Sequence, residues 1–142
     1  MIYITENSFA RQIHILQMAY ESANMEAILW VYPEELAHSI GGLHILENST
    51  NIEPVTIYED HGSKIRRTEP QLFDDQFIAH LLSQEKTISA GFDSIALYNP
   101  GSTKWSSCAI PHEKMILFRD NETLPFLIGK GLSASTTAPE WW

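Results

Sequence analysis

The stretch that decides the fold is Ala27-Ile28-Leu29-Trp30-Val31-Tyr32. This apolar run is short, ends at Pro33 and is rich in residues that favour strands over helices. A strand that is apolar at every position must be covered on both of its faces. The run therefore predicts the central strand of a sheet.

An amphipathic helix is predicted directly before this strand. Gaps of four, three, four and three place one set of apolar side chains on a single helical face: Phe9, Ile13, Leu16, Tyr20 and Ala23. Thr5, Asn7 or Ser8 can cap its first turn, and Asn24 is a suitable end. A short strand at residues 1–4 completes a strand, helix, strand order.

After the central strand the sequence predicts smaller elements. Pro33, Glu34 and Glu35 suit the first turn of a short helix, which Gly41-Gly42 would end. A strand at residues 43–46 should follow. Residues 55–58 and 64–67 then form the arms of a predicted hairpin around turn residues 60–63.

The second half predicts a further helix and a meander. After Pro70, helical spacing relates the apolar residues Leu72, Phe73, Phe77, Ile78, Leu81 and Leu82. Strands are expected at 94–98, 104–110 and 115–119, and a short helix at 124–129. We therefore predict one α+β domain over residues 1–132, with a mixed, mostly antiparallel sheet, about three to four packed helices, and a C-terminal tail over 133–142.

Composition favours a single folded domain in a reducing compartment. The chain has 142 residues, of which 44% are hydrophobic and 11% aromatic, enough for one core. Cys108 is the only cysteine, so neither a disulfide within the chain nor a multi-cysteine zinc site can form. No signal segment or membrane-length apolar stretch is evident, and we expect a cytoplasmic protein.

The charge is unevenly distributed along the chain. Its formal net charge is −9, and residues 1–63 hold nine acids against the single base Arg11. A negative surface repels nucleic acid and anionic lipid and attracts basic proteins. Neither a nucleic acid nor a membrane is therefore an expected partner, although net charge can also serve solubility alone.

Cys108 and His112, with Glu113 beside them, form the one closely spaced thiol and imidazole pair. A thiol nucleophile needs a base within hydrogen-bond reach. Four residues of extended strand span about 13 Å, so the pair meets only if Pro111 bends the chain back. A buried free cysteine that fills apolar space is the competing interpretation.

Other chemical patterns are incomplete, and we predict no catalytic residue, metal or cofactor. Glu35 and His38 have a spacing found in metal sites, with His44 nearby, but a second such pair is absent. The adjacent carboxylates Asp74-Asp75 and Glu59-Asp60 point in diverging directions and suit caps and turns. The glycine clusters Gly41-Gly42 and Gly129-Lys130-Gly131 match no nucleotide motif and are expected to end helices. Lys64, Arg66 and Arg67 could bind phosphate or simply lie on a solvated strand.

These observations favour a non-enzymatic, acidic protein-binding domain. The specific hypothesis is a bacterial immunity or antitoxin protein, monomeric or homodimeric, that covers the active surface of a basic toxin. The expected contact residues are Glu26, Glu34, Glu35, Glu47, Glu59, Asp60, Trp141 and Trp142. The alternatives are a small hydrolase that uses Cys108 and His112, and an oligomeric structural or accessory protein joined through its C-terminal tryptophans.

Overall fold

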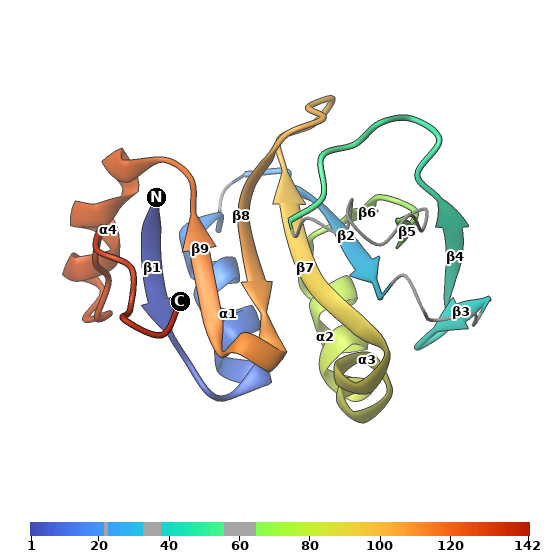
Figure 1. Cartoon of the computed structure of the whole chain (residues 1–142), viewed down its shortest axis with the longest axis horizontal. Coiled ribbons are helices and arrows are strands. Elements are labelled where there is room, and N and C mark those ends of the chain that lie inside the picture. Colours follow the sequence, from blue (N-terminus) through green and yellow to red (C-terminus); the bar gives the residue numbers. More distant parts are fainter. Residues whose placement is uncertain (22, 33–37, 56–64) are drawn as a thin grey trace.

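A computed structural model describes residues 1–21, 23–32, 38–55 and 65–142. These residues form one nine-stranded sheet in the order β1-β9-β8-β7-β2-β5-β4-β3, with β6 also paired to β2 (Figure 1). The strands are β1 (Ile2–Thr5), β2 (Glu26–Val31), β3 (Ser39–Ile40), β4 (Leu43–Glu47), β5 (Arg66–Thr68), β6 (Gln71–Leu72), β7 (Phe92–Tyr98), β8 (Trp105–Ile110) and β9 (Met115–Phe118). All pairings recorded among them are antiparallel, which confirms the α+β prediction.

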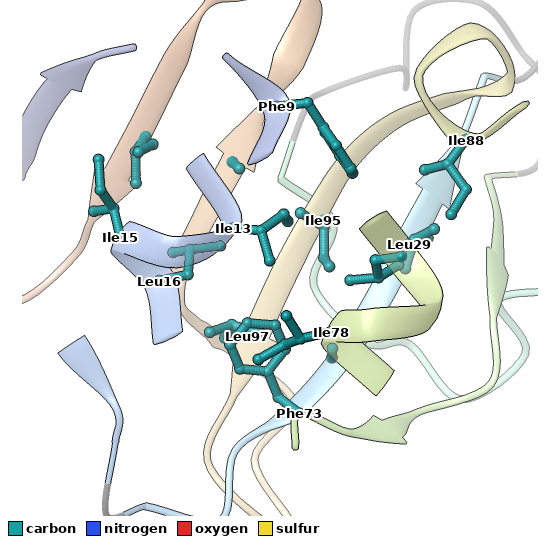
Figure 2. Packing of buried hydrophobic residues seen from close by; sticks show 14 of the residues in the cluster. Phe9, Ile13, Ile15, Leu16, Leu29, Phe73, Ile78, Ile88, Ile95 and Leu97 are labelled. Atoms are coloured by element: carbon teal, nitrogen blue, oxygen red, sulfur yellow. The ribbon is translucent and has the colours of Figure 1, made fainter. Parts of the chain in front are cut away.

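Four α-helices are present in the described residues: α1 (Phe9–Ala19), α2 (Asp75–Ser83), α3 (Glu85–Gly91) and α4 (Leu124–Gly129). In Figure 1, α1 and α2 lie behind the sheet, α3 lies at the lower end of β7, and α4 lies beside β1. Figure 2 shows Ile13 and Leu16 of α1 and Ile78 of α2 close to Ile95 and Leu97 of β7. This helix-covered face holds the larger core cluster.

The central strand β2 is buried on both faces, as predicted. It pairs with β7 on one side, with Leu29 opposite Ile95, and with β5 and β6 on the other. Leu29 belongs to the cluster under the helices, whereas Ile28 and Trp30 belong to a second cluster on the opposite face. Alternation along one strand thus supplies both cores.

Residues 48–55, which we call the 48–55 segment, cover part of this second face. Trp30 Nε1 donates a hydrogen bond to the Tyr98 hydroxyl at 2.9 Å, and that hydroxyl donates to the Glu53 carbonyl at 2.8 Å. The Glu53 amide donates to the Thr103 carbonyl at 2.8 Å. Each buried polar group in this chain of bonds therefore has a partner, and the segment is tied to β7 and to the turn that follows it.

Helix α1 begins where the sequence places it but ends earlier. The Ser8 hydroxyl accepts a hydrogen bond from the Arg11 amide at 3.2 Å, the expected N-cap contact. The backbone leaves the helical region at Tyr20 (φ −127°), so the predicted continuation to Asn24 is wrong. The Tyr20 ring still packs, because it stacks on Phe118 with centroids 6.3 Å apart.

Gly41 and Gly42 form a hairpin turn between β3 and β4 instead of ending a helix. Both glycines have positive φ (54° and 81°), the backbone that two-residue hairpin turns demand. The helix predicted to begin at Pro33 lies outside the described residues, as do most of the first arm and the turn of the hairpin predicted at 55–67. Part of the predicted return arm is β5, which pairs with β2 and β4.

The C-terminal residues are attached to the edge of the sheet. Ser135 exchanges two backbone hydrogen bonds with Tyr3, of 2.8 and 3.1 Å. The Trp142 ring meets the Tyr3 ring edge-on at 6.4 Å between centroids. The tail thus covers part of the β1 edge, which would otherwise offer unpaired backbone groups. None of the described helices is long and apolar enough to span a bilayer.

Candidate protein-binding surface

Two grooves meet at the exposed side chain of Leu72. The larger, of about 840 Å³, lies between the C-terminal end of α1 and the start of α2. The smaller, of about 490 Å³, lies along β6 and β5. Leu72 lines both grooves and is 52% exposed. We call this area the Leu72 surface, and its acidic members are Glu21, Glu26, Glu69, Asp74 and Asp75.

The pairing of β6 with β2 makes Leu72 face outward. Leu72 lies opposite Glu26 in the antiparallel register, and the Phe73 amide donates to the Met25 carbonyl at 2.9 Å. Successive side chains of an extended chain point to opposite sides, and Phe73 is buried in the core under the helices. Leu72 is consequently directed away from that core.

The sequence placed Leu72 on the buried face of the following helix, and this prediction is wrong. Helix α2 begins at Asp75, with Asp74 as its N-cap: the Asp74 carboxylate accepts from the Phe77 amide at 2.8 Å. The prediction that this acidic pair serves helix capping is confirmed for Asp74. The cap holds the chain extended through residue 74, so residue 72 stays outside the helical stripe.

Two carboxylates of the Leu72 surface, Glu21 and Glu26, have no partner in the part of the chain that the structure describes. Glu21 and Glu26 make no side-chain hydrogen bond or ion pair there, whereas Asp75 accepts from Gln17 Nε2 at 2.8 Å. Glu69 makes no hydrogen bond, but the positive charge of the Arg67 guanidinium attracts it. An unpaired carboxylate at a surface keeps its full charge available to an incoming cation. The groups therefore form a local anionic field around an apolar side chain.

Two bases line the grooves, but one of them is committed to internal contacts. Arg67 is only 4% exposed and donates to Asn48, Thr50 and the Thr68 carbonyl, each at 3.0 Å. Its guanidinium thus secures the 48–55 segment to β5, and it is a structural group, not a phosphate ligand. Lys130 lines the larger groove with its Nζ 5.5 Å from the Phe126 ring centroid, and the carboxylates outnumber it.

The structure separates the contact residues expected from the sequence. Glu26 lies on the Leu72 surface. Glu47 lies on β4, opposite Arg66 of β5. Trp141 and Trp142 are 57% and 46% exposed, but they lie beside β1. Four strand spacings, or about 19 Å, separate β1 from β2 in the sheet order. Four expected contacts lie outside the described residues: Glu34, Glu35, Glu59 and Asp60.

Cys108 occupies apolar space on β8. Its side chain has no exposed surface, and it packs in the cluster that contains Trp30 and Tyr98. Burial raises the pKa of the Cys108 thiol well above its ordinary range, which disfavours the thiolate that a nucleophile requires. This environment matches the interpretation of Cys108 as a small core residue.

His112 lies beside acids at the end of β8. Its Nε2 is 3.8 Å from the fully buried Asp93 carboxylate and 3.5 Å from Glu113. Its ring is tilted against Tyr32, with centroids 5.7 Å apart. The imidazole therefore has orienting acids, but the buried thiol of Cys108 is not presented to solvent as its nucleophile.

The structure describes two of the three candidate metal ligands. His38 and His44 are both exposed, and Glu35 lies outside the described residues. No group of three His, Cys, Asp or Glu suited to a metal ion occurs within residues 1–21, 23–32, 38–55 and 65–142. Gly131, the residue after the C-cap Lys130 of α4, has φ 82°, and a glycine at this position ends a helix as predicted.

Several members of the Leu72 surface were missed as contacts from the sequence. Glu21 follows α1 and lines one groove, and Glu69 follows β5 and lines the other. That the two grooves meet at Leu72 depends on the long-range pairing of β2 with β6. The available signal was Pro70, separated by one residue from the Leu72-Phe73 pair, because a proline near apolar residues allows strand alternation as well as helical spacing.

Comparisons with protein-family models, with curated proteins and with solved structures found no match. The functional proposal therefore rests on the geometry and charges of the Leu72 surface.

Proposed function

We propose that this chain is a non-enzymatic protein-binding domain whose Leu72 surface binds a basic protein. The observation that carries the proposal is the gathering of five carboxylates around one exposed leucine, two of them without a partner in the described chain. Protein interfaces combine an apolar centre with a polar rim, and complementary charge speeds association.

The biological form of this proposal is a bacterial immunity or antitoxin protein. Such an inhibitor needs a stable surface that is complementary to a cationic active site, and it needs no catalytic groups of its own. The Leu72 surface is built on β6, on the strand β2 that pairs with it, and on the ends of α1 and α2. A surface fixed by core elements loses little conformational entropy on binding.

The test compares capture of cellular proteins by three forms of the chain. The first is the natural chain, and the second carries Glu21→Gln, Glu26→Gln and Glu69→Gln. The third is a control with the same net charge, in which three exposed acids away from both grooves are neutralised: Glu85→Gln, Glu122→Gln and Glu140→Gln. The proposal predicts a basic protein that the natural and control forms retain and the Leu72-surface variant loses.

An immunity role also predicts inhibition. The captured protein should be toxic when produced alone and harmless when produced with the natural chain. Equal capture by both triple variants would contradict binding through the Leu72 surface, and capture of acidic proteins only would contradict the choice of partner.

The exposed tryptophans favour a second function, association through the C-terminus. Trp141 and Trp142 meet edge-on at 6.3 Å between centroids and leave about half of each side chain exposed. Exposed aromatic pairs are typical of interfaces. If they join two copies, deletion of both residues should halve the mass measured in solution; a natural chain that is already monomeric would contradict this alternative.

A further inference from the structure

Building on the proposed function, we infer that the partner presents a basic segment with an apolar side chain between its lysines or arginines. The apolar side chain packs on Leu72, and the flanking bases reach carboxylates in the two grooves. This inference names the chemistry of the bound segment, and it depends on the proposed function for the site.

Leu72 is placed as an anchor point between the grooves. It is the residue that both grooves share, and it is fixed by the pairing of β6 with β2. The next residue, Phe73, is held in the core, and the Asp74 amide donates to the Leu72 carbonyl at 3.0 Å. A pre-ordered apolar side chain gains contact area on binding at little entropic cost.

Carboxylates lie on both sides of this anchor. Glu21, Asp74 and Asp75 line the larger groove, and Glu26 and Glu69 line the smaller one. One basic side chain could neutralise only one of these groups of acids. A segment with bases on both sides of its apolar residue matches the charge in both grooves while it covers Leu72.

The apolar centre distinguishes this segment from a simple polycation. A polycation would be attracted by the net charge alone, and salt would screen that attraction. Contact with Leu72 adds a term that salt does not screen and that depends on the shape of the ligand. The structure therefore favours recognition of a particular sequence pattern over general binding to bases.

Two synthetic peptides of equal charge test the inference. One has two lysines on each side of a leucine, and the other has serine in place of that leucine. Their dissociation constants are measured with the natural chain, with Leu72→Ser, and with the control Ile128→Ser. Ile128 is an exposed apolar residue on α4 (55% exposed) that lines neither groove.

The natural chain should bind the leucine peptide about tenfold more tightly than the serine peptide. Leu72→Ser should abolish this preference, and Ile128→Ser should retain it. In nuclear magnetic resonance titrations, the leucine peptide should shift the backbone amide signals of Leu72 and Asp75.

Equal affinity of the natural chain for the two peptides would overturn the inference, as would a preference that survives Leu72→Ser. Suppose that the natural chain binds both peptides with equal affinity, while the variant with Glu21→Gln, Glu26→Gln and Glu69→Gln binds both more weakly. In that case the acidic binding surface is supported, and only the role of Leu72 as an apolar anchor is wrong. If neither peptide binds, and both triple variants capture the same proteins as the natural chain, the proposed function fails together with the inference.

Discussion

Glu53 and the Leu72 surface show two different uses of carboxylates in one acidic chain. The Glu53 carboxylate pairs with Arg119, whose guanidinium carbon lies 4.1 Å from the centroid of the Trp105 ring. The Glu53 backbone makes hydrogen bonds with the Thr103 carbonyl and the Tyr98 hydroxyl. Glu21 and Glu26 have no such partners in the described chain, and Glu69 has only the attraction of the Arg67 guanidinium, without a hydrogen bond. Net charge alone therefore does not identify an interface, because the bonding of each carboxylate decides whether it is available.

The comparison separates effects on stability from effects on binding. Changes to the contacts around Glu53 should lower the free energy of unfolding, since those contacts secure the second face of the sheet. Changes to the Leu72 surface should leave stability almost unchanged and should weaken binding.

The largest expected effect is that of Trp30→Ala. Trp30 is 1% exposed and fills the core below the 48–55 segment, so its removal leaves a cavity. We expect a loss of about 3–5 kcal/mol in the free energy of unfolding, measured by denaturant titration. Leu72→Ala, the matched change on the other surface, should alter it by less than about 0.5 kcal/mol. Similar losses for the two variants would remove the distinction.

Tyr98→Phe should have the next largest effect. The hydroxyl accepts from Trp30 and donates to the Glu53 carbonyl, so its loss leaves the buried Trp30 N–H and the partly buried Glu53 carbonyl unpaired. Such groups cost about 1–3 kcal/mol, which denaturant titration would resolve. A stability equal to that of the natural chain would show that the Tyr98 hydroxyl does not hold the 48–55 segment in place.

The buried thiol of Cys108 should make the free energy of unfolding depend on pH. Burial raises the pKa of its thiol in the folded chain, whereas the pKa of the unfolded thiol is about 8.5. Below that pH the thiol is protonated in both the folded and the unfolded chain, and the free energy of unfolding has its full value. Above it the unfolded chain loses the proton first, so the free energy of unfolding should fall by up to about 1.4 kcal/mol per pH unit.

Cys108→Ala is the control for this pH dependence. Denaturant titrations between pH 8 and about 10 should show a smaller decline in the variant. Above that range Tyr98 should add to the decline in both proteins, because burial also raises the pKa of its hydroxyl. If the free energy of unfolding falls equally in the natural chain and in Cys108→Ala below about pH 10, the pH dependence does not come from the Cys108 thiol.

The smallest expected effect concerns single carboxylates. Glu53→Gln weakens a half-exposed ion pair and should cost about 0.2–1 kcal/mol. Glu69→Gln removes an exposed charge that the Arg67 guanidinium attracts without a hydrogen bond, and it should cost less than that. A larger loss for Glu69→Gln, found by denaturant titration, would reveal a structural role for that carboxylate.

Elements with strong local patterns were predictable from the sequence. The continuous apolar run of β2, the stripe of α1 and the meander of β7, β8 and β9 each carry their periodicity in a short window. The α+β class followed from their order. The pairing of β2 with β7 joins residues far apart in the chain, and no local pattern encodes that choice of neighbour.

The Leu72 surface was less predictable because competing patterns overlap. Leu72 and Phe73 fit a helical stripe as well as an alternating strand, and the Asp74 cap decides between them only in the folded chain. The excess of acids in residues 1–63 was visible. Which acids remain unpaired depends on tertiary contacts such as that of Glu53 with Arg119.

The most direct test of the account is the association rate of the captured basic partner with the two triple carboxamide variants. At low salt, the variant at Glu21, Glu26 and Glu69 should associate about tenfold more slowly than the natural chain, with a weaker dependence on ionic strength. The variant at Glu85, Glu122 and Glu140, which has the same net charge, should remain close to the natural rate. Equal rates for the two variants at every salt concentration would contradict the claim that the carboxylates around Leu72 form the binding surface.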